Sequence, residues 1–176
     1  MGNHQRRLGL SPQRTPGRTG HGGRRKSAVR SLPAILTIVH LVGLSLALGA
    51  ATVKLVLLLW CRADGELVQA FLKVARPITR LIVAGMILLA LSGSGWLLVA
   101  YDLTLLLIVK LALFGAVFVL GPIIDNVAEP RFRKLAPPAD GPGSPEFLRA
   151  RRQYLALEVA ATLLFYVIVV LWVMAS

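Results

Sequence analysis

Ionisable side chains inside long apolar stretches are the first residues of this sequence that could do chemistry. His40 and Lys54 interrupt the apolar run 33–60, and Lys110 and Glu158 interrupt two later runs. At 100° per residue, the polar and small side chains of the first run share one helical stripe. Its members are His40, Gly43, Ala47, Ala51 and Lys54. An ionisable group that faces lipid costs several kcal/mol, so we expect this stripe to face protein.

Three polar positions are predicted to lie at one depth. In four spans of alternating direction, His40, Ser92 and Lys110 would each lie about 10 to 12 Å from the same membrane face at 1.5 Å per residue. Gly93 and Gly95, beside Ser92, would let a ligand or a helix approach closely. This pattern predicts a cofactor pocket in the outer half of the bilayer. The alternatives are a histidine hydrogen-bonded within a bundle, a lysine that snorkels to the surface and glycines that serve helix packing.

Four charged side chains are predicted near the opposite face by the same arithmetic. They are Lys54, Arg80, Asp125 and Glu158. On the last span, Glu158 shares a helical face with Thr162 and Phe165, which would turn the carboxylate inward toward Lys54. We expect structural ion pairs here, because pairing offsets the cost of burying charge. A proton relay is the alternative.

The spans that must position these residues follow from the composition. The 176 residues are 56% hydrophobic, with a mean hydropathy of +0.69, which is too apolar for a soluble domain of this size. We predict an all-α, multi-pass transmembrane four-helix bundle, with a short interfacial amphipathic helix between the first two spans that ends at Pro77. Residues 1–32 are predicted to be a basic, disordered segment, and 125–144 a loop. The four spans are predicted at 33–60, 78–100, 103–124 and 145–174.

Local signals mark the ends of these spans. Ser144, Pro145 and Glu146 are predicted to be the N-cap, first-turn proline and first-turn acid of the last helix. The residues predicted to form an aromatic belt near the span ends are Trp60, Trp96, Tyr101, Tyr154 and Trp172.

Basic residues flank these spans and predict their orientation. The chain has a net charge of +12, yet Lys and Arg cluster beside apolar runs rather than along one face, so we expect no nucleic-acid partner. The positive-inside rule places the connections 61–77 and 125–153 in the cytoplasm and the C-terminus outside the inner membrane. Eight Lys and Arg residues within 1–30 favour the opposite orientation. One hypothesis that removes this conflict is a later translation start, for example at Val29. Cys61 is the only cysteine and is expected to be an inert interfacial thiol.

Several of these motifs resemble a known group of membrane proteins. They are His40 in the first span, an Arg-led second span (TRLIVAGMILLALSGSG), Lys110 in LLLIVKLALF and Glu158 in LEVAATLL. Together they resemble the CopD-type copper-resistance membrane domain and its relative, the HemJ-type protoporphyrinogen IX oxidase, over residues 36–172. In HemJ-type proteins, a first-helix histidine and an intramembrane lysine are implicated in haem binding and activity. The matching positions here are His40 and Lys110.

The resemblance implies a haem-binding membrane protein with a porphyrinogen-oxidase-like role. His40 would be an axial ligand of haem b, and Lys110 a second ligand or the partner of a propionate. Because one membrane histidine cannot supply two His ligands, a homodimer or a non-His ligand is then implied. CopD-like copper handling is an alternative, although Met, His and Cys are not grouped at helical spacing. A cofactor-free accessory or scaffold protein is the third reading, and the sequence does not decide whether the chain is an enzyme.

Overall fold

Helices make up the computed structural model, which describes residues 23–61, 64–99 and 104–174. The elements are α1 (Gly23–Trp60), α2 (Gly65–Val99), α3 (Leu105–Ile123), the π-helical turn η1 (Ile124–Ala128), α4 (Glu129–Lys134) and α5 (Pro145–Val173). Four helical stretches are long and apolar enough to cross a membrane: Leu32–Trp60, Gly65–Leu98, Leu105–Lys134 and Pro145–Val173. The chain is therefore an all-α, multi-pass integral membrane protein whose outer surface contacts lipid.

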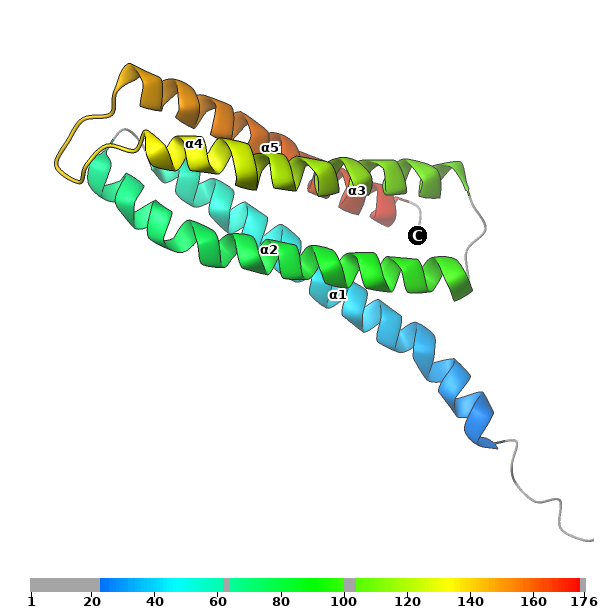
Figure 1. Cartoon of the computed structure of the whole chain (residues 1–176). Helices are drawn as coiled ribbons and strands as arrows, with labels where there is room; N and C mark the ends of the chain where they lie inside the picture. Colours follow the sequence, from blue (N-terminus) through cyan, green and yellow to red (C-terminus); the bar gives the residue numbers. More distant parts are fainter. Residues whose placement is uncertain (1–22, 62–63, 100–103, 175–176) are drawn as a thin grey trace, which may run out of the picture.

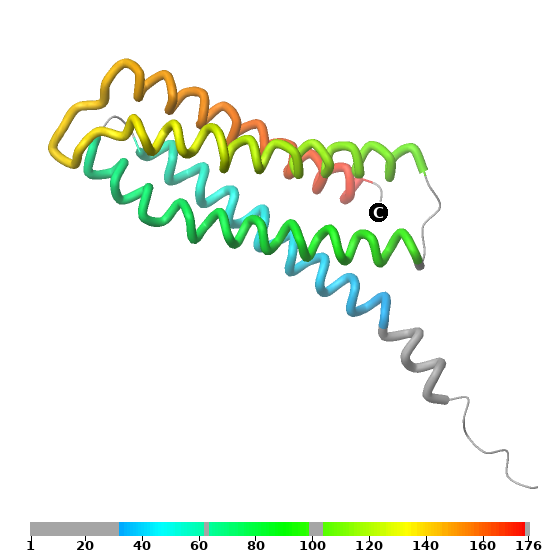
Figure 2. Tube along the Cα trace, viewed as in Figure 1, coloured from blue at the N-terminus to red at the C-terminus, as the bar shows by residue number. Residues whose placement is uncertain are grey.

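The helices pack as two pairs that meet along α1 (Figure 1). α1 lies against α2 and α5, and α3 lies against α5. α2 and α3 run in opposite directions, as expected for consecutive spans, but α3 packs against α5 rather than against α2. The loop 135–144 closes one end of the bundle, where the Gln69 side chain donates a hydrogen bond to the Pro137 carbonyl at 2.9 Å. The start of the described part of α1 and the end of α5 lie at the opposite end (Figure 2).

Two predicted boundaries are wrong because helices continue through proline. α2 passes through Pro77, so no separate interfacial helix ends there. Its buried face is Val68, Phe71, Leu72 and Ala75, whereas Leu67 and Val74 are exposed. This stretch packs against Phe132 and Phe147 instead of lying on the membrane surface. Bundle packing therefore outweighs the hydrogen bond that proline removes.

The third span also extends further than expected. Residues 125–134, predicted to be loop, form η1 and α4, so the helical stretch runs to Lys134. Pro122 lacks an N–H group, and the wide turn η1 follows it directly, with the Asn126 amide donating to the Pro122 carbonyl at 2.9 Å. The consequence is that Asp125 and Glu129 lie on ordered helix inside the bundle.

The two chain ends compare differently with their predictions. α1 begins at Gly23, before the predicted start at Pro33, while residues 1–22, and with them most of the predicted disordered segment, lie outside the described residues. At α5 the prediction is confirmed: Ser144 is the N-cap, its hydroxyl accepts a hydrogen bond from the Phe147 N–H at 3.1 Å, and Pro145 occupies the first turn.

Candidate functional site in the charged cluster around Lys54

Lys54 is the centre of a buried group of charges. Its ammonium Nζ lies 2.8 Å from Glu158 Oε1, 3.4 Å from Glu129 Oε2 and 3.6 Å from Asp125 Oδ1. It also donates a hydrogen bond to the Thr79 hydroxyl at 2.9 Å. One cation is thus surrounded by three carboxylates and a hydroxyl, which come from α1, α2, η1, α4 and α5. Every helical element except α3 contributes a side chain to this one site.

Arg133 and Tyr154 hold the Glu129 carboxylate in place. Glu129 accepts a hydrogen bond from Arg133 at 3.1 Å and one from the Tyr154 hydroxyl at 3.4 Å. The Tyr154 ring lies 5.5 Å from the Lys54 ammonium and packs against Phe71 and Phe132. Tyr154 is fully buried, so it belongs to the core and not to the aromatic belt at the membrane surface. The Tyr154 ring is thus within cation–π distance of the ammonium and is held in position by the two phenylalanine rings.

Burial differs among the members of the cluster. The side chains of Lys54, Glu158 and Glu129 are 2%, 5% and 8% exposed, whereas that of Asp125 is 30% exposed. Thr162, one turn beyond Glu158 on α5, is buried, and its hydroxyl has no hydrogen-bond partner among the described residues. Among the three carboxylates, Asp125 alone is open to its surroundings, and an unsatisfied hydroxyl lies next to the most buried one.

The charges in this cluster do not balance. Lys54 and Arg133 supply two positive charges, and Asp125, Glu129 and Glu158 supply three negative ones if all are ionised, a net charge of −1. An uncompensated charge is expensive in a medium of low dielectric constant, and binding one proton removes it. The Lys54 ammonium itself fills the space between the carboxylates. Across residues 23–61, 64–99 and 104–174, no three His, Cys, Asp or Glu side chains are grouped to hold a metal ion.

His40 and Ser92 form a second polar contact, towards the other end of the bundle. His40 Nδ1 lies 2.9 Å from Ser92 Oγ, and the Ser92 hydroxyl also lies 2.7 Å from the Leu88 carbonyl. A hydrogen bond at Nδ1 orients the ring and leaves Nε2 free for another partner. The apolar residues that separate this pair from the Lys54 cluster are Ala47, Met86, Leu89, Val117 and Phe165.

The structure brings together only part of the predicted outer pocket. His40 meets Ser92, but Leu36 fills the notch at Gly95, because a Cβ atom placed there would lie 2.7 Å from the Leu36 side chain. A Cβ atom at Gly93 would meet nothing within 4 Å, so no neighbouring helix occupies that position. Lys110 is half-buried on α3, which packs against α5. The glycines thus serve helix packing at Gly95 and face outward at Gly93.

Most of the predicted inner group of charges does come together. Lys54, Asp125 and Glu158 come together, whereas Arg80 is exposed and does not join them. The predicted stripe of the first span does face protein, because Gly43, Ala47, Ala51 and Lys54 are all buried.

No protein-family model, no curated protein and no solved structure matches this chain. Interpretation of the cluster therefore depends on its own geometry.

Four members of the cluster are not predicted from the sequence: Thr79, Glu129, Arg133 and Tyr154. The stretch EPRFRK, which contains Glu129 and Arg133, is polar and contains proline, so it is predicted to be a loop, and Tyr154 is predicted to lie at the membrane surface. A usable signal existed: Asp125, Glu129 and Arg133 recur at intervals of four residues, which is the spacing of one helical face. Thr79, which accepts from Lys54, carried no comparable signal.

Proposed function

We propose that this chain is a proton-coupled membrane protein, in which the Lys54 cluster binds and releases one proton. The observation that carries the proposal is the excess of carboxylates: Lys54 contacts Asp125, Glu129 and Glu158 at once. A balanced pair such as one Lys and one Glu would serve as a structural lock without needing a proton. Here the third carboxylate has no cation to balance it and would bind a proton. This proton would be shared among the carboxylates of the cluster and not bound to one particular residue.

Proton exchange would take place from one side only. Asp125 is the most exposed carboxylate of the cluster, which makes it the entry point for a proton. Towards the other end of the bundle, the apolar layer around Ala47 and Phe165 separates the cluster from His40 and Ser92. Such an arrangement supports binding and release without an open proton channel. In the orientation favoured by the positive-inside rule, the exchanging side is the cytoplasm.

Protonation would act on how the helices pack. Because α1, α2, η1, α4 and α5 all place a side chain in the cluster, a change of one charge there alters the attraction between all of them. Loss of the proton adds repulsion between the carboxylates of η1, α4 and α5. A local change of charge would thus change the packing of these helices against one another. The coupled movement of η1 and α4 relative to α1 is the proposed working step.

Hydrogen exchange of the purified protein tests this proposal. With rates corrected for intrinsic pH dependence, amides of 124–134 should exchange faster at alkaline than at neutral pH in the wild type. Asp125→Asn and Glu158→Gln each balance the cluster charge and should remove this difference. Glu66→Gln, at an exposed position, is the matched control and should behave like the wild type. Equal corrected exchange at both pH values in the wild type would overturn the proposal and favour a structural lock.

A haem-type role at His40 is a second candidate, favoured by the His40 to Ser92 contact that leaves Nε2 free. It agrees with the resemblance to CopD-type and HemJ-type proteins. Within one chain, however, the described residues do not fit a haem, because Leu36 fills the notch at Gly95 and Lys110 belongs to a helix that packs against α5. A second copy of the chain would have to complete the pocket.

Absorption spectroscopy separates this candidate from the first. Protein purified from haem-replete cells should show a Soret band that His40→Ala abolishes and Arg80→Ala leaves unchanged. A colourless protein, or a band unaffected by His40→Ala, would rule out His40 as a haem ligand and would leave the Lys54 cluster untouched.

A further inference from the structure

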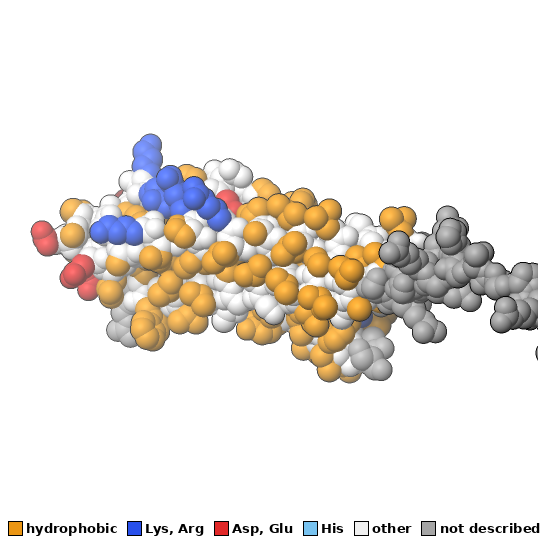
Figure 3. All heavy atoms as spheres, turned by 90° about the horizontal axis from the view of Figure 1, so that it is seen from below, with side chains coloured by type: hydrophobic (Ala, Val, Ile, Leu, Met, Phe, Trp, Pro, Cys, Tyr) orange, Lys and Arg blue, Asp and Glu red, His pale blue; other side chains and the backbone are white. Residues whose placement is uncertain are grey.

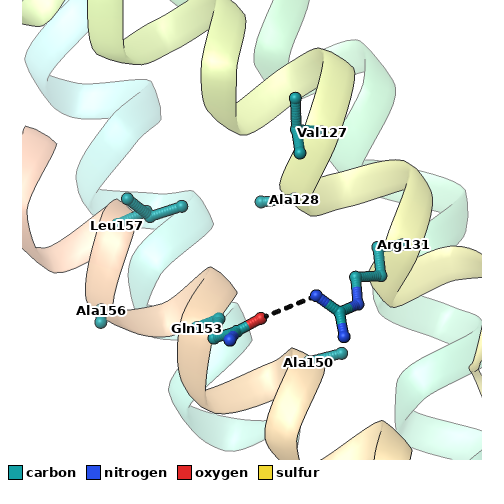
Figure 4. Close-up of a pocket in the computed structure, with 7 residues that line it drawn as sticks. All are labelled: Val127, Ala128, Arg131, Ala150, Gln153, Ala156 and Leu157. Carbon is teal, nitrogen blue, oxygen red and sulfur yellow. Dashed lines mark hydrogen bonds between the residues drawn. The ribbon is translucent and has the colours of Figure 1, made fainter.

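A groove between η1 and α4 on one side and α5 on the other lies outside the Lys54 cluster and has a volume of about 360 Å³. Figure 4 shows the residues that line it. They are Val127, Ala128, Arg131, Ala150, Gln153, Ala156 and Leu157. One end of the groove is polar, where Arg131 Nη1 donates a hydrogen bond to Gln153 Oε1 at 3.2 Å. The other end, at Val127 and Leu157, is apolar.

The two ends differ in their depth along the helices. Val127 precedes Arg131 by four residues and Leu157 follows Gln153 by four, which separates the polar and apolar ends by about 6 Å along each helix axis. Because α5 runs towards the far end of the bundle from Pro145, the polar end is the one nearer the 135–144 loop. A ligand in this groove would therefore place a polar group near that loop and an apolar chain deeper in the bilayer.

The charge around the polar end selects an anion. Residues 129–152, which include the ion pair of Glu129 with Arg133, contain six Lys and Arg residues and three acidic residues, a net charge of +3. Figure 3 shows, on another face, that Lys and Arg side chains gather towards the same end of the molecule, with Asp and Glu side chains at its tip and hydrophobic side chains over much of the remaining described surface. The bond to Gln153 uses one N–H group of the Arg131 guanidinium, which carries five and binds phosphate well.

We infer that this groove binds an anionic phospholipid of the leaflet next to the 135–144 loop. Arg131 contacts the lipid phosphate, with Gln153 holding the guanidinium in place. An acyl chain packs along Val127, Ala156 and Leu157. Basic pockets between transmembrane helices are suited to anionic headgroups, and the cytoplasmic leaflet contains lipids with such headgroups. This inference concerns η1, α4 and α5 and does not depend on proton binding at Lys54.

Thermal unfolding of the detergent-purified protein tests the site with defined lipids. Phosphatidylglycerol should raise the melting temperature more than phosphatidylcholine does, and inorganic phosphate at the same concentration should have no effect. Arg131→Ala should remove at least half of the phosphatidylglycerol-specific rise. Ala156→Phe, which fills the groove and keeps the charge, should do the same. Arg152→Ala removes an exposed charge that does not line the groove and should retain the rise.

Three outcomes would overturn the inference. An undiminished lipid-specific rise in both Arg131→Ala and Ala156→Phe would show that the groove is not the site. An equal loss in Arg131→Ala and Arg152→Ala, with none in Ala156→Phe, would indicate diffuse surface charge. A rise of the same size with inorganic phosphate would indicate a site for free phosphate instead of a lipid.

Discussion

Lys54 is the residue on which the interior of this protein depends most. Its side chain is 2% exposed and lies within 3.6 Å of three carboxylates from three elements. Removing its charge leaves these carboxylates beside one another, and among the described residues Arg133, paired with Glu129, is then the one cation in contact with them. An uncompensated buried charge costs far more than an intact pair gains.

We therefore expect Lys54→Met to destabilise the protein by about 3 to 5 kcal/mol. The double variant Lys54→Met, Glu158→Gln removes one cation and one carboxylate and should recover part of this loss. Unfolding in a denaturing detergent measures both effects. Lys73→Met, at an exposed position, is the control and should stay close to the wild type. A Lys54→Met protein as stable as the Lys73→Met protein would show that the ion cluster is not essential for stability.

The rate at which the Cys61 thiol is alkylated is expected to depend steeply on pH. Burial raises the pKa of its thiol from 9.0 to about 11, and its carbonyl accepts a hydrogen bond from Arg151 at 2.6 Å. The thiolate is the reacting form, so a rise of two pH units in pKa makes alkylation roughly a hundredfold slower at neutral pH. The rate should increase about tenfold per pH unit up to pH 11.

Iodoacetamide labelling followed by mass spectrometry checks this expectation. The control is an exposed thiol, Asp140→Cys in a Cys61→Ala background, which should react rapidly and level off near its ordinary pKa. Equal labelling rates of the two thiols at neutral pH would contradict the buried position of Cys61.

Much of the residue-scale picture could be predicted from the sequence. The stripe from His40 to Lys54 was expected to face protein because small and polar side chains recur at helical spacing, and its last four members are buried. Lys54 and Glu158 were expected to meet because each lies on an inward face at a similar depth. Arg80 could not be excluded in this way, since depth along a helix does not decide which side of that helix faces the bundle.

At the scale of elements, the crossing of α1 and α2 depends on glycine. A Cβ atom at Gly85 would lie 2.5 Å from the Ala47 nitrogen and 2.7 Å from the Gly43 carbonyl oxygen, so no larger side chain fits without moving a helix. Small residues at such crossings let transmembrane helices approach closely and gain dispersion contacts. The contact is located between the Lys54 cluster and the His40 to Ser92 pair and fixes both.

Gly85→Ala is expected to destabilise the protein by about 1 to 3 kcal/mol, because the added methyl group pushes α1 and α2 apart. The matched control is Gly115→Ala on α3, where a Cβ atom would meet nothing within 4 Å. That substitution should be neutral or stabilising, since alanine favours helix. Unfolding in detergent compares the two, and a loss of stability in Gly115→Ala equal to that in Gly85→Ala would contradict close packing at Gly85.

Element boundaries were the least predictable part of the fold. Proline and polar residues suggested ends at Pro77 and at Asp125, yet α2 continues and η1 and α4 extend the third helical stretch. In both places, the packing of buried aromatic side chains between helices, among them Phe132 and Phe147, stabilises the continued helix. Such tertiary contacts cannot be read from local sequence, whereas the Ser144 cap of α5 is a local signal and was predicted correctly.

Within the part of the molecule that the structure describes, two polar groups lie at different heights along the bundle, with an apolar layer between them. The Lys54 cluster lies towards the 135–144 loop, the His40 to Ser92 pair lies towards the other end, and Ala47, Met86 and Phe165 lie between them. An even number of spans puts the start of the first span and the end of the last at the same end (Figure 2). The basic residues near the 135–144 loop favour a cytoplasmic location for that end.

This orientation can be checked with one introduced thiol. Asp140→Cys in a Cys61→Ala background places the cysteine in the exposed 135–144 loop. In intact cells, a membrane-impermeant maleimide should fail to label it, and inside-out vesicles should label it fully. Labelling in intact cells that matches labelling in inside-out vesicles from the first minutes would place the loop outside and reverse the orientation.

The central claim is that the Lys54 cluster holds a proton, and infrared spectroscopy of the protein in lipid measures this directly. At neutral pH, where exposed carboxyl groups are ionised, the wild type should show the carbonyl band of one protonated carboxyl group, and raising the pH should remove it. Glu158→Gln leaves two cations and two carboxylates, so the band should be absent at neutral pH, while Glu66→Gln should keep it. A wild-type protein with no such band, or a band that survives in Glu158→Gln, Glu129→Gln and Asp125→Asn alike, would contradict the claim.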